Sequence, residues 1–175
     1  ASHPRAVDSL STPLVVQLTD DNGDGLWNEL DVPDLVFVSA DLTYLLEPQV
    51  ALRAIRGDTG APIFDVEGVI VHPTNPQLLS FSGLAAGDID GDGDADLLGG
   101  AYDFADLTWW ENQGEGTAWA KLSIATDFSA RGVAIADLDA DGREDALAVG
   151  PAGFKWWRHN PAGTWTGYAV PTAVT

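Results

Sequence analysis

The chain contains no cysteine, and it has only eight lysines and arginines among its 175 residues. The lack of cysteine excludes disulfides, thiol catalysis and zinc-thiolate sites, although a secreted protein held together by metal ions does not need disulfides. No apolar run is long enough to span a membrane, and no signal peptide is recognisable. The sequence starts without an initiator methionine, as expected of a processed product or a part of a longer protein.

Basic residues are few against 27 aspartates and glutamates, which gives a formal net charge of -19 and a pI near 4.1. Such strong acidity argues against a nucleic-acid backbone as the partner. The sequence is still 45% hydrophobic and contains seven tryptophans. We therefore expect a folded chain with a substantial core, organised as one domain or a set of repeats.

Catalytic motifs are also missing from the sequence. No motif connects His3, His72 or His159 to a serine or to one another, and neither a phosphate-binding loop nor a dinucleotide fingerprint is present. Aspartates are abundant enough for a glycosidase pair. Those that have regular spacing are better used as metal ligands, so the sequence predicts a protein that is not an enzyme.

Three acidic loops stand out, at residues 20–31 (DDNGDGLWNELD), 88–96 (DIDGDGDAD) and 137–145 (DLDADGRED). Each has oxygen-bearing side chains at alternate positions followed by a glycine, the spacing that wraps a loop around a hard cation. Together they hold 15 of the 27 acidic residues and a single basic one, Arg143. Plain hairpin turns are the alternative, but a turn needs only one or two such residues. The pattern therefore favours metal.

The second and third loops lie in a repeat of about 49 residues, a length typical of propeller blades. Residues 83–88 align with 132–137, and Trp109-Trp110 recurs as Trp156-Trp157. Four strands are expected in each repeat: 14–19, 34–40, 50–56 and 62–66 in the first, 83–89, 96–101, 107–111 and 118–125 in the second, and 132–138, 146–149, 154–158 and 164–170 in the third. The expected divisions are an N-terminal arm (1–12) and blades at 13–82, 83–128 and 129–175, with connections at 41–49 and 72–77 in the first blade.

The order of apolar strand, DxDxDGxxD loop and apolar strand resembles the FG-GAP/VCBS repeats of integrin α-subunit propellers and of many secreted bacterial proteins. The segment 109–112 (WWEN) is similar to the third strand of bacterial members. This resemblance covers about residues 13–170. It implies an all-β fold of calcium-stabilised β-propeller blades, with the ions on hairpin loops at one face. Closed propellers have about four to eight blades, so we expect a partial propeller or one completed by other chains or segments.

The motif also assigns the ligands. They are the side chains of Asp88, Asp90, Asp92 and Asp96 with the carbonyl of Asp94 in the second loop, and those of Asp137, Asp139, Asp141 and Asp145 with the carbonyl of Arg143 in the third. The first loop follows a twelve-residue EF-hand register, with Asp20, Asn22, Asp24, the Leu26 carbonyl, Asn28 and Asp31 as ligands. Asp34 is an alternative to Asp31 as its last ligand. We expect about three Ca²⁺ ions, with weaker binding in the first loop.

These features favour a non-enzymatic calcium-binding module for adhesion or recognition, secreted or at a cell surface, with a protein or glycan partner. A self-assembling ring or filament is an alternative, because three blades leave apolar outer faces that must be covered. A lectin using the paired tryptophans is another, although one tryptophan of each pair is expected in the core because neighbouring strand residues point to opposite faces. A non-catalytic fragment of a secreted enzyme is the fourth.

Overall fold

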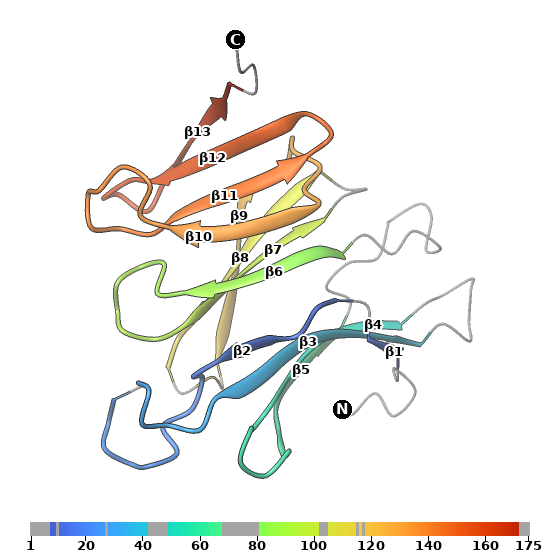
Figure 1. Ribbon diagram of the computed structural model, residues 1–175, viewed down its shortest axis with the longest axis vertical. Helices are drawn as coiled ribbons and strands as arrows, with labels where there is room; N and C mark the ends of the chain where they lie inside the picture. The colour runs from blue at the N-terminus through green and yellow to red at the C-terminus, as the bar shows by residue number, and fades with distance from the viewer. Residues whose placement is uncertain are drawn as a thin grey trace.

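The computed structural model describes residues 8–9, 11–26, 28–41, 49–67, 81–101, 105–114, 116 and 118–171. Within these ranges all regular structure is β, arranged as three antiparallel sheets (Figure 1). No helix of the length and apolarity needed to cross a membrane is found in this part of the chain. The predicted fold class, all-β with successive antiparallel blades that do not close into a ring, is confirmed.

Blades 2 and 3 are four-stranded sheets in which each strand pairs with the next one along the chain. Blade 2 consists of β6 (Phe81–Gly87), β7 (Asp96–Ala101), β8 (Asp106–Asn112) and β9 (Trp119–Ala125), and blade 3 of β10 (Gly132–Ala136), β11 (Asp145–Gly150), β12 (Gly153–His159) and β13 (Trp165–Val170). These bounds match the predicted strands to within a residue or two. Alternating apolar residues between turn signals therefore located both blades.

Blade 1 differs in its first strand, which is divided into two short segments. Its strands are β1 (Asp8–Ser9), β2 (Leu14–Val16), β3 (Asp34–Asp41), β4 (Gln49–Ile55) and β5 (Pro62–Glu67). Both β1 and β2 pair with β3, with Asp8 opposite Ala40 and Leu14 opposite Val36. The segment expected as an N-terminal arm therefore contributes β1 to the sheet. The connections expected at 41–49 and 72–77 fall almost entirely outside the described residues.

The first strand of every blade ends two or three residues earlier than predicted, and the cause is the same each time. The apolar residues Leu18, Ile89 and Leu138 were expected to extend these strands. Their backbone N–H groups instead donate to the carboxylates of Asp34, Asp96 and Asp145. A side chain has therefore replaced the neighbouring strand as the hydrogen-bond partner, and the ladder stops.

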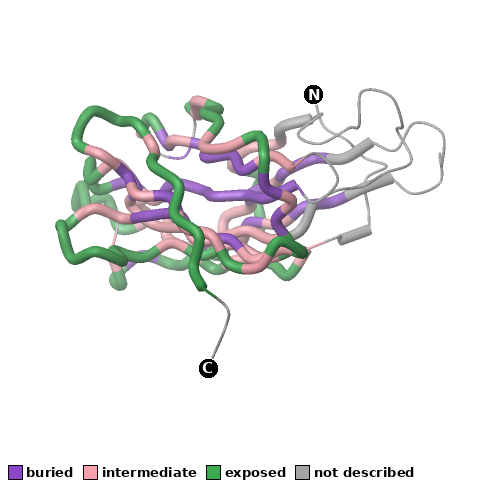
Figure 2. Tube along the Cα trace, turned by 90° about the horizontal axis from the view of Figure 1, so that it is seen from above, coloured by how far each residue is buried: buried purple, intermediate pink, exposed green. Residues whose placement is uncertain are grey.

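The blades pack face to face, with two hydrophobic clusters between them. Trp110 packs with residues of β3 and β4 between blades 1 and 2, whereas Trp109 packs with Trp157 and Phe128 between blades 2 and 3. Figure 2 shows the buried positions running through the middle of the molecule. Trp109 and Trp110 are both only 5% exposed. The expected alternation therefore places the two indoles of one pair in different interfaces.

The first strands of the blades lie side by side, because β6 neighbours both β2 and β10. Close approach depends on glycine here. A Cβ atom on Gly83 would lie 3.4 Å from the Cα atom of Gly132 in the adjacent blade. The acidic loops follow directly from these first strands, so the packing that sets the blade spacing also sets the spacing of the loops.

Candidate metal-binding loops

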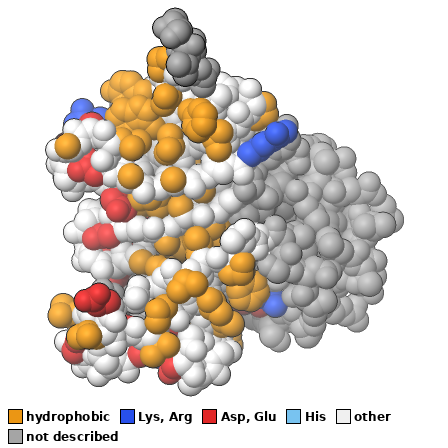
Figure 3. All heavy atoms as spheres, viewed as in Figure 1, with side chains coloured by type: hydrophobic (Ala, Val, Ile, Leu, Met, Phe, Trp, Pro, Cys, Tyr) orange, Lys and Arg blue, Asp and Glu red, His pale blue; other side chains and the backbone are white. Residues whose placement is uncertain are grey.

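Each acidic loop joins the first strand of its blade to the second, and all three loops lie on the same side of the molecule (Figure 1). Figure 3 shows Asp and Glu side chains gathered along that side. Strands that run in equivalent directions in successive blades bring their loops to one edge. The repeat therefore converts three separate stretches of sequence into one acidic face.

The second and third loops each bring three carboxylates together. Oxygen atoms of Asp88, Asp90 and Asp92 all lie within 4.8 Å of one another, and so do those of Asp137, Asp139 and Asp145. Calcium binds oxygen at about 2.3–2.6 Å, so ligands on opposite sides of one ion are about 5 Å apart. Both trios consist only of hard oxygen donors. Their chemistry and spacing therefore fit a single calcium-sized ion in each loop.

Backbone N–H groups hold these carboxylates in position. Asp88 accepts hydrogen bonds from Gly91 N–H at 2.8 Å and Gly93 N–H at 3.1 Å, and Asp137 accepts one from Gly142 N–H at 2.9 Å. Gly93 and Gly142 have φ angles of 101° and 86°, in the left-handed region expected from their place in the motif. A carboxylate oxygen has two lone pairs, so these bonds leave capacity for a metal.

A buried aspartate follows each loop at the start of the second strand or ends the loop there, and its carboxylate has a structural task. Asp34, Asp96 and Asp145 each begin the second strand of a blade and are buried. One carboxylate oxygen accepts the N–H at the end of the first strand, as described above. The other accepts an N–H near the end of the third strand, from Gly57 at 3.1 Å, Asn112 at 2.8 Å and His159 at 2.9 Å respectively. Each carboxylate therefore ties three parts of its blade together.

In blade 1 this position belongs to Asp34 and not to Asp31. The Asp31 carboxylate turns back into its own loop, where it accepts the N–H groups of Asp21 and Asn28 at 3.1 and 2.9 Å. In this longer loop, Asp31 therefore caps the extra residues, and Asp34 ties the strands together.

The other oxygen-bearing ligands expected in the first loop also accept backbone N–H groups. Four side-chain oxygens of the loop each accept a backbone N–H from a residue two to five positions later: Asp20 from Gly25, Asn22 from Asp24, Asp24 from Leu26, and Asn28 from Leu30. In the described part of this loop, no trio of carboxylates gathers as in the other two. Its ligand set of Asp20, Asn22, Asp24, Leu26, Asn28 and Asp31 stays a prediction, as do the assignments in the other loops.

The second and third loops bring together aspartates from different positions of the motif. Its trio contains the last position, Asp145, whereas the fifth position, Asp141, hydrogen-bonds to Nη2 of Arg158 at 2.8 Å. The same guanidinium forms an ion pair with Asp139 through Nε at 2.8 Å. The place of Arg158 is taken in blade 2 by Glu111, because both residues immediately follow the tryptophan pair.

The two acidic loops consequently differ in how far their negative charge is compensated. Burial is the main cause of a raised pKa at Glu111, and Asp90 and Asp92 raise it further. Burial also raises the pKa of Asp96 to about 7. In the third loop, the hydrogen bond from Arg158 lowers the pKa of Asp141. The second loop thus concentrates uncompensated negative charge, while the third already contains a cation.

Sequence reasoning did not single out Glu111 or Arg158. Both lie on third strands, away from the motif that identifies the loops. When WWEN at 109–112 is aligned with WWRH at 156–159, Glu111 and Arg158 occupy the same position. This change of charge between the repeats was the sequence signal that could have identified them. Their contact with the loops depends on strand pairing, which spacing within the loop does not show.

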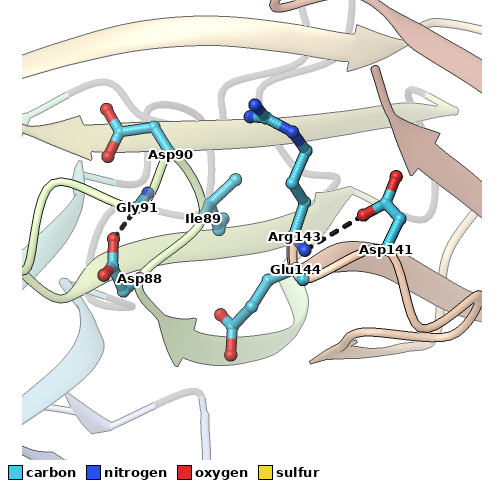
Figure 4. A pocket seen from close by; sticks show the side chains of 8 residues that line it. Asp88, Ile89, Asp90, Gly91, Asp141, Arg143 and Glu144 are labelled. Carbon is cyan, nitrogen blue, oxygen red and sulfur yellow. Dashed lines mark hydrogen bonds between the residues drawn. The ribbon is translucent and has the colours of Figure 1, made fainter. Parts of the chain in front are cut away.

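A hollow of about 460 Å³ separates the second and third loops (Figure 4). Asp88 and Asp90 line one side, and Asp141 and Glu144 the other. In the close-up, the side chains of Arg143 and Glu144 point in opposite directions. Burial raises the pKa of Glu144, and Asp88 contributes to the shift. The hollow is thus lined by four carboxylates together with Ile89, Arg143 and two glycines.

Comparison with known proteins agrees with this architecture. The chain resembles the crystal structure of the V. cholerae biofilm matrix protein Bap1, with a TM-score of 0.61 and 21% identity over 93% of this chain. The match covers 31% of the Bap1 chain, so the present chain spans about a third of it. A search of curated proteins gave no match. Residues 88–148 match the family model of the FG-GAP-like repeat, and this segment, which contains the second and third acidic loops, is therefore an FG-GAP-like repeat.

Proposed function

We propose that the chain is a non-enzymatic, calcium-binding β-propeller-type module for adhesion or recognition on a secreted or cell-surface protein. The observation that carries this proposal is the pair of carboxylate trios, each compact enough for one ion. The FG-GAP-like repeat supports an extracellular setting. The fold shared with a biofilm matrix protein agrees with a role in adhesion.

Calcium would supply positive charge to loops that otherwise hold several carboxylates at short range. The chain's own contribution is the preformed shape of each loop. Asp88 and Asp137 are oriented by glycine N–H groups, and Asp96 and Asp145 anchor the end of each loop to the third strand. Neutralising these loops would stabilise the first hairpin of each blade, so the ions are proposed to act on the scaffold.

His159 and the aspartates of the second and third loops have structural partners in the described part of the chain. His159 is only 3% exposed, and its ring nitrogen Nδ1 hydrogen-bonds to the carbonyl oxygen of Ile89. The aspartates of the second and third loops are committed to backbone N–H groups, to the carboxylate trios or to Arg158.

The lectin alternative loses most of its candidate residues. Trp109, Trp110 and Trp157 are buried between blades and are therefore not available to stack on a sugar. Trp156 is partly exposed, but it already stacks on Tyr168 with ring centroids 4.8 Å apart. The burial and stacking of the tryptophan pairs therefore favour a role in packing over sugar binding.

Association with a further blade is supported by the outer face of blade 3. Phe154 and Tyr168 are 46% and 42% exposed there, on either side of the partly buried Trp156. Figure 3 shows hydrophobic side chains gathered over this part of the molecule. Trp156 corresponds to Trp109, which blade 3 covers in blade 2. We propose that a blade from another segment or another chain packs here in the same way.

Calorimetric calcium titration and thermal unfolding test the metal proposal. Calcium should raise the melting temperature, because a ligand that binds only the folded state stabilises it by mass action. The variants Asp90→Ala and Asp139→Ala should each remove one binding event, while Asp127→Ala, on an exposed turn outside the loops, should remove none. Unchanged melting in saturating calcium together with no heat of binding would overturn the proposal.

A further inference from the structure

The three blades place one residue in an equivalent position beside each acidic loop. Asp34, Asp96 and Asp145 receive an N–H from Gly57, Asn112 and His159 near the end of the third strand. The residues immediately before these donors are Arg56, Glu111 and Arg158. The same hydrogen bond fixes the register in every blade. The Cα atoms of these three residues therefore occupy equivalent positions beside their loops.

In blade 3 the side chain at this position binds the loop itself. Arg158 contacts Asp139 through Nε and Asp141 through Nη2, each at 2.8 Å. Both aspartates belong to the ligand set expected for the third loop. A planar guanidinium that bridges two carboxylates supplies, within the chain, part of the positive charge that a metal ion would supply.

In blade 2 the equivalent side chain has the opposite charge. Glu111 is partly buried, and the N–H of the next residue, Asn112, donates to Asp96 at 2.8 Å, so Glu111 adjoins the second loop. It therefore adds negative charge to a cluster that has no arginine in the corresponding place. Calcium loops are tuned by the number of charged groups around the ion, so this difference bears directly on affinity.

Blade 1 shows a third arrangement. Arg56 pairs with Asp21 and with Asp58, the latter at 3.3 Å. Neither carboxylate belongs to the ligand set expected for the first loop. Arg56 is therefore held beside its loop by carboxylates outside the expected ligand set, unlike Arg158.

We propose that in blades 2 and 3 this position on the third strand sets the calcium affinity of the adjoining loop: Glu111 makes the second loop the tighter site, and Arg158 acts as a built-in counter-ion that weakens the third. The inference rests on the proposed calcium-binding function. Calcium must displace Arg158 or share Asp139 and Asp141 with it. At the second loop the corresponding side chain is a carboxylate, so it does not compete with the ion for the ligands. The second loop therefore fills first as calcium rises, and the third fills at higher concentrations.

Site-resolved NMR titration of the whole chain tests this order. The backbone amides of Gly93 and Gly142 hydrogen-bond to Asp88 and Asp137, so each reports on one loop. We expect the Gly93 signal to reach its midpoint at about tenfold lower calcium than the Gly142 signal. The variant Arg158→Gln should lower the Gly142 midpoint by about tenfold, and Glu111→Gln should raise the Gly93 midpoint.

Arg143→Gln is the matched control for loss of charge. It removes one positive charge from the third loop and leaves both ion pairs of Arg158 intact, so it should shift the Gly142 midpoint much less than Arg158→Gln does. If neither glycine signal responds to calcium, the proposed function fails. If both respond with the same midpoint, and Arg158→Gln and Glu111→Gln leave the midpoints unchanged, calcium binding stands and this inference is overturned. Should Arg158→Gln not fold, Glu111→Gln decides the result.

Discussion

His159 of blade 3 donates its ring Nδ1–H to the carbonyl oxygen of Ile89 in blade 2, at 3.0 Å. A carbonyl oxygen only accepts hydrogen bonds, so Nδ1 must carry the proton. The backbone N–H of Ile89 donates to Asp96, and that of His159 donates to Asp145. One buried hydrogen bond therefore joins the last aspartates of two neighbouring loops.

Removal of this bond should destabilise the contact between blades 2 and 3. In His159→Phe, a ring can still stack on Trp165, whose centroid lies 4.5 Å from that of the imidazole. The Ile89 carbonyl, however, loses its buried partner, which typically costs about 1–3 kcal/mol. Urea unfolding of the metal-free protein measures the loss. His159→Gln retains an N–H donor and should recover part of it. Equal stability of His159→Phe and the wild type would contradict this role.

Asp96 should support the fold even without metal. Both of its oxygens accept backbone N–H groups, so the amide nitrogen of Asp96→Asn would face one of the donors. We expect a loss of about 2–3 kcal/mol in chelator, measured by denaturant unfolding. Asp92→Asn is the control, since Asp92 lies on the exposed part of the loop and should lose calcium stabilisation with little change in chelator. A small effect of Asp96→Asn in chelator would show that Asp96 acts only as a ligand.

Calcium stabilisation should increase between pH 5 and pH 8. Burial raises the Asp96 pKa from 3.8 to about 7, so the folded, metal-free protein holds a proton there that the unfolded chain has released. Its contribution to the unfolding free energy in chelator therefore decreases as the pH rises through this interval. Calcium binds the carboxylate form, so its effect grows as that proton leaves. Melting temperatures with calcium and with chelator at each pH test this. A calcium increment that is independent of pH would contradict it.

Sequence patterns predicted the blades well because each strand follows a local alternation. The first strands were predicted too long because Leu18, Ile89 and Leu138 are apolar and continue the pattern. Only the fold shows that the backbone N–H groups of these residues donate to buried aspartates and not to a neighbouring strand. In the same way, the motif predicted Asp139 and Asp141 as ligands but gave no sign of Arg158, which reaches them from another strand. Local spacing specifies a loop, whereas tertiary pairing determines which charged side chains from other strands lie beside it.

Ala140 has a positive φ of 61° at the point where the second loop has Gly91, with φ 82°. A side chain in the left-handed region costs about 1–2 kcal/mol, while glycine costs about 0.5–1 kcal/mol in chain entropy. Ala140→Gly should therefore stabilise the protein by about 0.5–1 kcal/mol, measured by thermal unfolding in chelator.

The reverse substitution isolates the backbone as the cause. No atom lies within 4 Å of a Cβ built on Gly91, so Gly91→Ala should destabilise through backbone strain alone. Ala136→Gly, at an exposed position of β10, controls for the entropy of glycine and should lower the melting temperature. If Ala140→Gly behaves like Ala136→Gly, the left-handed turn of the third loop carries no strain. A gain confined to Ala140→Gly would instead show that this loop keeps its shape at the expense of stability.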